Sequence, residues 1–241
     1  MKFSDGKIAT SDEESANAVK AHQEEVFSVN KEFDTLRVDN MKKYPTRDEL
    51  GSTPTFQEFK AAIKRSAPDK APGESGVCIN AFKAMNDENL EIFYHALTSY
   101  WLNDEADAVE FHTATLKLAQ KKGDLSNPKN WRPIQLLDSF RKLITAIIAH
   151  RLDEYLVKDI GLEAQHGFSS SRGCPDATSC LKIALQQLRH AGKEAFVLFV
   201  DLIKAFDTVN REMLWKILIN MGLPDSLVSV IKKAYKDVTI I

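Results

Sequence analysis

The sequence predicts a helix-rich α+β protein. Most apolar side chains recur every three or four residues, as in 88–102, where they form one stripe. Strand character is confined to the β-branched, alternating residues 113–119, the wholly apolar run 195–200 and the last residues, 237–241. The 241 residues are 44% hydrophobic, which is enough for a real core in one large domain or two small ones.

The amino-terminal half is expected to consist of helices. Ser11 or Asp12 can cap a first helix, whose opening turn is acidic. Thr55 can cap a second helix, because apolar residues follow it at spacings of three and four. Two prolines and two glycines in 67–76 interrupt the helical pattern. Helices are predicted to resume at about 79–85 and 88–102.

The carboxyl-terminal half mixes strands and helices. The strand at 113–119 leads into a turn, KKGDLSNPKN, at 121–130. The run 195–200 has no polar alternation, which is typical of a strand buried on both faces. Pro175 suits the first turn of a helix. Helices are predicted over 136–157, about 175–188, about 210–221 and 225–235.

Composition excludes several classes of protein. Three cysteines are too few for a disulfide framework, and none lies at zinc-finger spacing from another Cys or a His. No eighteen successive residues are apolar, and the polar start lacks the apolar core of a signal peptide. We therefore expect an intracellular protein that neither spans a membrane nor enters the secretory route.

Charge is unevenly distributed along the chain. The net charge is −2, but residues 111–151 hold eight basic and two acidic residues. Such a segment is a candidate surface for a polyanion. The alternative is that these lysines and arginines only solvate helix faces, and charge alone does not decide between the two.

Asp201 directly follows the apolar run 195–200. A carboxylate at the end of a buried strand must be solvated, paired or metal-bound, because burying it alone is costly. Functional acids are often found at the carboxyl ends of strands in open sheets. Asp also caps turns through its side-chain oxygen. Spacing alone leaves the functional and the turn-capping role equally open.

Five sequence blocks, in the same order, resemble the reverse transcriptases of the non-LTR retrotransposon class. The block around Asp201 is similar to that family's first catalytic motif, Asp-Leu-x-Lys-Ala-Phe-Asp. The chain departs from the family at Glu74-Ser75, where Pro followed by Asp is usual. It also departs at Ala119-Gln120 and at Ser169-Ser170. The five blocks are DKAPGESGVCINAFKAM (69–85), LKLAQKKGD (116–124), NWRPIQLLDSFRKLITAIIAHRL (130–152), QHGFSSSRGCPDAT (165–178) and FVDLIKAFDTVNRE (199–212).

The resemblance implies a right-hand polymerase fold. Residues 1–54 would be a helical connecting region upstream of the polymerase domain. Residues 55–241 would be a truncated reverse transcriptase domain. Its fingers would cover about residues 69–190. Residues from about 195 to 241 would form the start of its palm, with an incomplete antiparallel sheet.

The resemblance also implies two-metal phosphoryl transfer with Mg²⁺. Asp201 would be the catalytic, metal-binding carboxylate, and the backbone carbonyl of Leu202 a second oxygen ligand, a donor type that magnesium prefers. Phe206 would pack beneath the sugar of the incoming nucleotide and disfavour a ribose 2′-hydroxyl. The alternative for Phe206 is a plain core position. Asp207, the second acid of the motif, is expected to cap or accept a hydrogen bond.

The basic segment would hold the triphosphate. Arg132 matches the fingers residue that clamps phosphate oxygens, since a planar guanidinium can grip them bidentately. Lys121 and Lys122 are candidates for the same deoxynucleoside triphosphate. Arg172 is a candidate contact for the template backbone, although an ordinary surface arginine is equally compatible.

The resemblance implies that the partners are an RNA template and a DNA primer, with no membrane involved. It also implies a role in the nucleus, where such elements copy RNA at a chromosomal nick. No Asp-Asp pair follows Asp201, although the family takes further metal ligands from such a pair. We therefore expect a fragment of an RNA-directed DNA polymerase that is inactive alone. The alternatives are a non-catalytic nucleic-acid-binding remnant and a decayed retroelement fragment.

Overall fold

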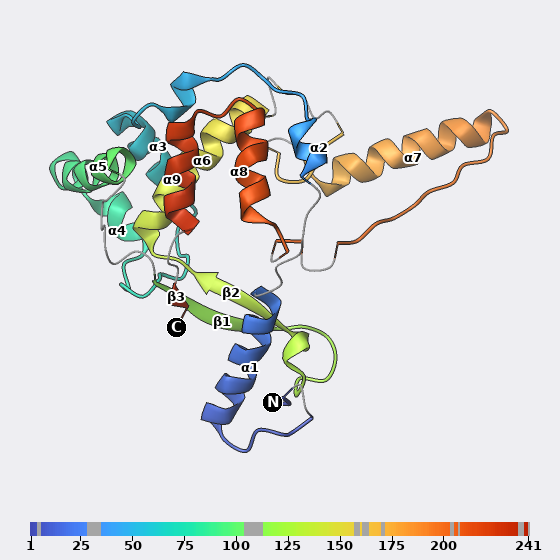
Figure 1. Ribbon diagram of the computed structural model, residues 1–241, viewed down its shortest axis with the longest axis horizontal. Coiled ribbons are helices and arrows are strands. Elements are labelled where there is room, and N and C mark those ends of the chain that lie inside the picture. The colour runs from blue at the N-terminus through green and yellow to red at the C-terminus, as the bar shows by residue number, and fades with distance from the viewer. Residues whose placement is uncertain are drawn as a thin grey trace. The chain divides into compact units, whose positions relative to one another are not determined.

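The computed structural model describes residues 1–3, 6–27, 35–103, 113–156, 160, 164–169, 172–202, 205–206, 208–235 and 239–240 (Figure 1). The chain forms two compact units. The larger unit contains Met1–Ile147 and Lys204–Ile241, and the smaller contains Ile148–Ile203. Within the described ranges, no helix combines the length and the apolar character needed to cross a bilayer.

The described residues are mainly helical, as predicted. The helices are α1 (Asp12–Phe27), α2 (Leu36–Asp39), α3 (Phe56–Arg65), α4 (Ile79–Ala84), α5 (Asp87–Leu102), α6 (Ser139–Tyr155), α7 (Cys174–His190), α8 (Arg211–Asn220) and α9 (Asp225–Tyr235). Two short 3₁₀ helices are η1 (Asp48–Gly51) and η2 (Pro128–Asn130). The strands are β1 (Thr113–Gln120), β2 (Trp131–Leu136) and β3 (Thr239–Ile240).

Helix α3 begins where its capping residue was predicted. The Thr55 hydroxyl accepts from the Glu58 backbone N–H at 3.2 Å, and the Glu58 carboxylate accepts from the Thr55 N–H at 2.9 Å. This capping box satisfies two backbone donors that a helix start leaves without partners. The box fixes the residue at which α3 begins, and therefore which side chains face the core. Phe59 is one of them and is fully buried.

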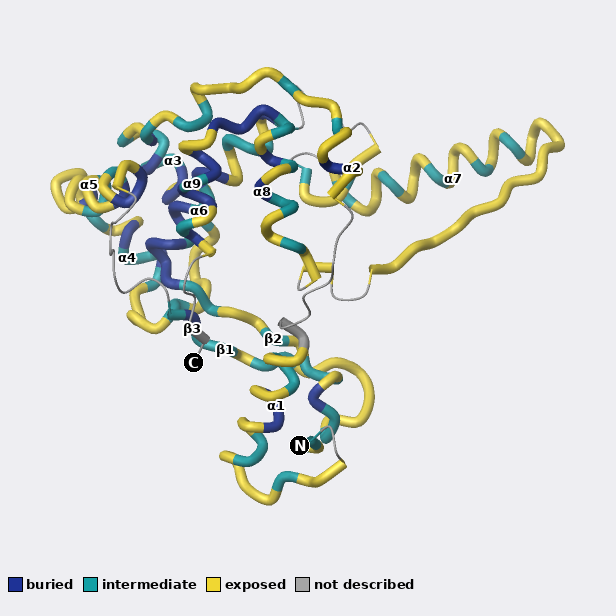
Figure 2. Tube along the Cα trace, in the orientation of Figure 1, coloured by how far each residue is buried: buried dark blue, intermediate teal, exposed yellow. Residues whose placement is uncertain are grey.

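The core of the larger unit is built from buried residues on several helices (Figure 2). Lys233 at the end of α9 donates to the backbone oxygen of Tyr100 in α5 at 2.9 Å. The buried Arg141 of α6 donates to the backbone oxygen of Ala234 in α9. These links join α5, α6 and α9 around fully buried side chains, which include Phe59, Phe82, Leu97, Phe140, Leu143, Ile147, Leu227 and Val230.

The loop at 67–77 is held against the start of α6. The Ser75 hydroxyl donates to the buried carboxylate of Asp138, and the Ser139 hydroxyl donates to the Val77 oxygen at 2.7 Å. A Cβ on Gly73 would lie only 2.5 Å from the Asp138 nitrogen, so the close approach requires glycine. Ser75 stands where the family usually has Asp, and its hydroxyl supplies a donor that a carboxylate lacks.

A small sheet has the strand order β2-β1-β3. Strands β1 and β2 pair antiparallel, from Thr115 opposite Leu136 to Gln120 opposite Trp131. Strand β3 pairs parallel with the start of β1, where Ala114 lies opposite Ile240. The strands expected at 113–119 and near the end of the sequence are therefore confirmed. The antiparallel sheet was expected in the palm, at about 195–241. Among the described residues the antiparallel pair is β1 and β2, which lie in the range assigned to the fingers, and β3 of the palm range pairs parallel with β1.

The buried strand predicted over 195–200 is wrong. This segment of the smaller unit runs back from the end of α7 without strand pairing, and Figure 2 shows it as exposed. Phe196 is 95% exposed and Leu198 is 86% exposed. An apolar run forms a buried strand only when neighbouring strands satisfy its backbone and cover both faces. No described segment supplies such a neighbour, so composition alone misled the prediction.

Candidate nucleotide and nucleic-acid site

The hairpin of β1 and β2 presents a basic face. Lys117 lies opposite Ile134, and Ala119 lies opposite Arg132. Because opposed residues, and residues two apart on one strand, share a face of a sheet, all four side chains lie on the same side. Lys117 and Arg132 are exposed, and Ile134 is 43% exposed. This face of the hairpin is therefore open and positively charged.

The turn of the hairpin carries the two predicted lysines. The Lys121 N–H donates to the Asn130 oxygen at 2.8 Å, which extends the strand pairing into the turn. The Asn130 side chain donates to the Asp124 backbone oxygen at 2.8 Å. Gly123 has a φ of +119°, a conformation that favours glycine. Lys121 and Lys122 are exposed at this hydrogen-bonded turn.

The structure thus brings three predicted residues together on one element. Lys121, Lys122 and Arg132 share the hairpin with Lys117 and with Lys129 of η2, and all five side chains are exposed. We call Thr113–Leu136, with these five cations, the basic hairpin. Adjacent cations on an open surface attract phosphate groups.

Asp124 is the acidic residue within this turn. Its carboxylate accepts from the Ser126 hydroxyl and N–H, each at 2.9 Å, and from the Lys2 ammonium at 3.1 Å. The Ser126 hydrogen bonds, followed by the contact with Lys2, lower the pKa of Asp124 to about 2. Asp124 was not predicted as a site residue, and no sequence motif connects it with Lys2.

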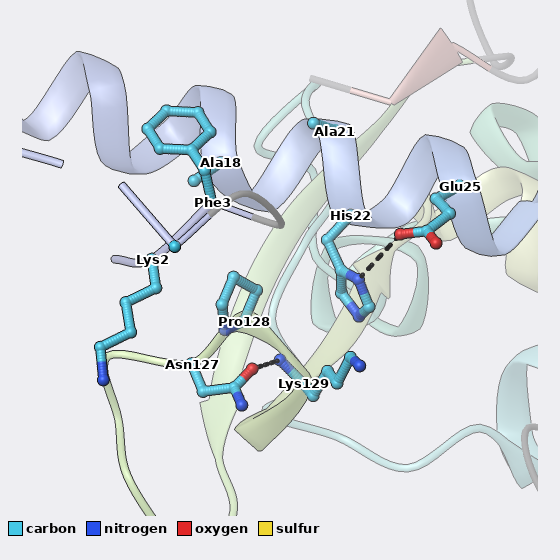
Figure 3. A pocket seen from close by; sticks show the side chains of 10 residues that line it. Lys2, Phe3, Ala18, Ala21, His22, Glu25, Asn127, Pro128 and Lys129 are labelled. Atoms are coloured by element: carbon cyan, nitrogen blue, oxygen red, sulfur yellow. Dashed lines mark hydrogen bonds and ion pairs between the residues drawn. The ribbon is translucent and has the colours of Figure 1, made fainter. Parts of the chain in front are cut away.

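A cavity of about 330 Å³ lies beside the turn (Figure 3). It is bounded by the first residues of the chain, by α1 and by η2. The His22 side chain lies near Lys129, and its Nδ1 is 3.9 Å from a Glu25 oxygen. The Asn127 side chain accepts from the Lys129 N–H at 3.0 Å. The cavity was also missed by sequence analysis, since nothing in the sequence relates residues 2–25 to 127–129.

The remaining predicted site residues are divided between the two units. Asp201, Leu202 and Arg172 belong to the smaller unit, and all three are exposed. Phe206 belongs to the larger unit and is 77% exposed, so it is not the core residue of the alternative interpretation. Asp207 lies outside the described residues.

The described residues do not complete a magnesium site around Asp201. Among them, no three His, Cys, Asp or Glu side chains gather closely enough to hold a metal ion. The Asp201 carboxylate and the Leu202 carbonyl are oxygen donors of the kind that magnesium takes, but its octahedral shell needs six ligands. These two donors fit only part of such a shell.

Comparison with known proteins identifies the family. The reverse transcriptase (RNA-dependent DNA polymerase) family matches residues 119–240, just over half of the chain. The chain belongs to this family. The match begins within β1 of the basic hairpin and continues through Asp201 to β3.

Curated relatives agree with this assignment. An uncharacterized 149 kDa protein of transposon TX1 from Xenopus laevis is 31% identical over 70% of the chain. A Pol polyprotein from the type-1 retrotransposable element R2 of Popillia japonica is 27% identical over 76% of the chain. A probable RNA-directed DNA polymerase from transposon BS of Drosophila melanogaster is 27% identical over 95% of the chain.

The chain spans 13% of the length of the first relative and 24% of each of the other two. With the ordered motifs, these relatives confirm that the chain is a reverse transcriptase domain of the non-LTR class.

Proposed function

We propose that this chain is the part of an RNA-directed DNA polymerase that binds the incoming deoxynucleoside triphosphate next to an RNA template and a DNA primer. The assembly of Lys121, Lys122 and Arg132 on one exposed hairpin carries this proposal. Three residues chosen from sequence blocks lie on one exposed hairpin of a chain that belongs to the reverse transcriptase family.

The hairpin cations would act on the triphosphate. Arg132 would form paired hydrogen bonds to phosphate oxygens, because its guanidinium is planar and permanently charged. Lys121 and Lys122 would neutralise the remaining phosphate charge as compact ammonium point charges. Phe206 would lie beneath the deoxyribose and exclude a 2′-hydroxyl, and Arg172 would contact the template backbone.

Asp201 would contribute to metal binding. Reverse transcriptases generally use divalent metal ions, and Mg²⁺ stabilises charge at the transferred phosphate in such reactions. Asp201, with the Leu202 carbonyl, would supply part of the ligand shell. Because no Asp-Asp pair follows Asp201 in the sequence, we propose that the 241 residues bind substrates but do not extend a primer by themselves.

The division into subdomains is part of the proposal. Residues 1–54 would precede the polymerase domain, about 69–190 would form the fingers, and about 195–241 would begin the palm. The family match from residue 119 onward supports the placement of the basic hairpin and of Asp201 within one polymerase domain.

A second candidate is a nucleic-acid-binding protein without chemistry. The specific observation in its favour is that the basic hairpin is formed, whereas no described group of acidic side chains could hold a metal ion with Asp201. This function would use Lys121, Lys122 and Arg132 to bind phosphates of the template–primer duplex.

The test is triphosphate binding by the 241-residue chain with template–primer present, measured with a fluorescent deoxynucleoside triphosphate. Arg132→Gln should weaken binding about tenfold or more, since a hydrogen bond to a charged group contributes about 1.5–3 kcal/mol. Arg65→Gln is the matched control, because Arg65 is an exposed arginine on α3. Equal triphosphate affinity for Arg132→Gln and the wild type would overturn the nucleotide-binding role. Binding of template–primer by a chain that shows no measurable triphosphate affinity would favour the second candidate.

A further inference from the structure

The basic hairpin is connected to the first residues of the chain, which lie outside the blocks that resemble the family. The geometry points to Lys2 and Asp124 as positioning residues: they hold the turn of the basic hairpin so that Lys121 and Lys122 face bound phosphate. This inference rests on the proposed function, because it concerns the residues that hold the phosphate-binding lysines of that same site in place.

Two direct contacts join Lys2 to the turn. The Lys2 backbone N–H donates to the Ser126 oxygen at 2.7 Å, and the Lys2 ammonium lies 3.1 Å from the Asp124 carboxylate. The same carboxylate accepts two hydrogen bonds from Ser126. Lys2 therefore contacts both the backbone and the central side chain of the turn, and its charge is matched by Asp124.

The contacts continue from Asp124 to the phosphate-binding lysines. The Asp124 backbone oxygen accepts from the Asn130 side chain, and the Asn130 backbone oxygen accepts from the Lys121 N–H, both at 2.8 Å. Lys122 follows directly and precedes Gly123, which has a positive φ. A displacement of Asp124 would thus reach the backbone that sets the direction of both lysines.

Lys2 is itself held in place. It forms a β-bridge with Ile8, and the Met1 oxygen accepts from the Ala9 N–H at 2.7 Å. Helix α1 follows, and its Ala18, which is only 3% exposed, lines the cavity together with the buried Pro128 of η2 (Figure 3). The first residues and α1 thus form a support on one side of the turn.

The substitution Asp124→Asn distinguishes a positioning role of the Asp124 carboxylate from a purely electrostatic one. Asp124 is the acidic residue beside Lys121 and Lys122, so Coulomb's law predicts that Asp124→Asn binds a polyanion more tightly than the wild type. Positioning predicts the opposite sign. We expect Asp124→Asn to bind template–primer about threefold to tenfold more weakly, a typical size for coupling within one hydrogen-bonded network.

The matched control is Asp87→Asn. Asp87 forms an ion pair with Lys60 at 2.9 Å, and its side chain is 65% exposed, compared with 59% for Asp124. The same carboxylate-to-amide change there should leave binding unaltered. Because Asp124 is exposed, the unfolding midpoint by circular dichroism should show that the Asp124→Asn chain remains folded.

The experiment is fluorescence anisotropy with a labelled RNA–DNA template–primer across a range of salt concentrations. Weaker binding by Asp124→Asn, with a shallower salt dependence and no added loss in Lys2→Gln/Asp124→Asn beyond that of Lys2→Gln alone, supports the inference. Unchanged or tighter binding by Asp124→Asn overturns it, as does full additivity of the two substitutions. Arg132→Gln tests phosphate binding without altering Lys2 or Asp124, so a failure of the proposed function is recognised separately.

Discussion

Replacing Phe196 with Ala tests the exposed state of the apolar segment that precedes Asp201. Phe196 is 95% exposed and belongs to no strand, so the substitution removes almost no buried surface. We expect the free energy of unfolding to change by no more than about 0.5 kcal/mol, the usual range for surface substitutions. A buried Phe in a strand would instead lose about 3–5 kcal/mol on truncation to Ala.

The assay is urea unfolding of the 241-residue chain followed by far-UV circular dichroism. Phe59→Ala is the matched control, because Phe59 is 0% exposed in α3 and the same truncation should cost about 3–5 kcal/mol. Hydrogen exchange of residues 194–201 should be fast, since their backbone is unpaired. A loss of about 2 kcal/mol or more in Phe196→Ala would show that the segment is packed and would refute its exposed state.

Three further predictions concern side chains near the basic hairpin and α6. Ser75→Ala should lower the free energy of unfolding by about 1–3 kcal/mol, because the buried Asp138 carboxylate loses a donor; an unchanged urea midpoint would contradict this. Lys121→Gln and Lys122→Gln should each reduce the slope of log K against log salt for template–primer by about 0.7–0.9, and slopes equal to the wild type would exclude phosphate contacts there. The pKa of Asp124 is about 2 in the folded chain, below its ordinary value of 3.8, so its contribution to stability is complete above about pH 4 and is lost as the pH falls through about 2. The free energy of unfolding of Asp124→Asn, measured against pH, should lack the part of the acid loss that Asp124 causes. The same dependence on pH in the variant and the wild type would argue against the depressed pKa.

Local signals predicted the helices well. Thr55 and Glu58 form a capping box that depends only on neighbours along the chain, and α3 begins there as expected. Pro175 lies in the first turn of α7, where its fixed φ suits the helix and its missing N–H has no cost. The strand at 113–119 was also recognised, because its β-branched residues precede a strong turn signal.

Features that depend on distant partners were not predictable in the same way. The apolar residues 195–200 carry a strand signal, but a strand also needs neighbours that composition does not specify. The contact of Lys2 with Asp124 joins residues far apart in sequence, and although Asp124 ends the block 116–124, no motif relates it to Lys2. The resemblance to reverse transcriptases was more informative for the hairpin, because it selected Lys121, Lys122 and Arg132 before their register was known.

The most direct test of the central claim is primer extension with an RNA template, DNA primer, deoxynucleoside triphosphates and Mg²⁺. The 241 residues would be followed by the corresponding downstream region of a non-LTR reverse transcriptase, and Asp201→Asn would be compared with the unsubstituted chain and with Asp87→Asn. We predict that Asp201→Asn lowers the rate of nucleotide addition by about 10³-fold or more, since a metal ligand at the transferred phosphate contributes several kcal/mol, while Asp87→Asn extends normally. Extension by Asp201→Asn at the wild-type rate would contradict the role of Asp201 and the polymerase mechanism built on it.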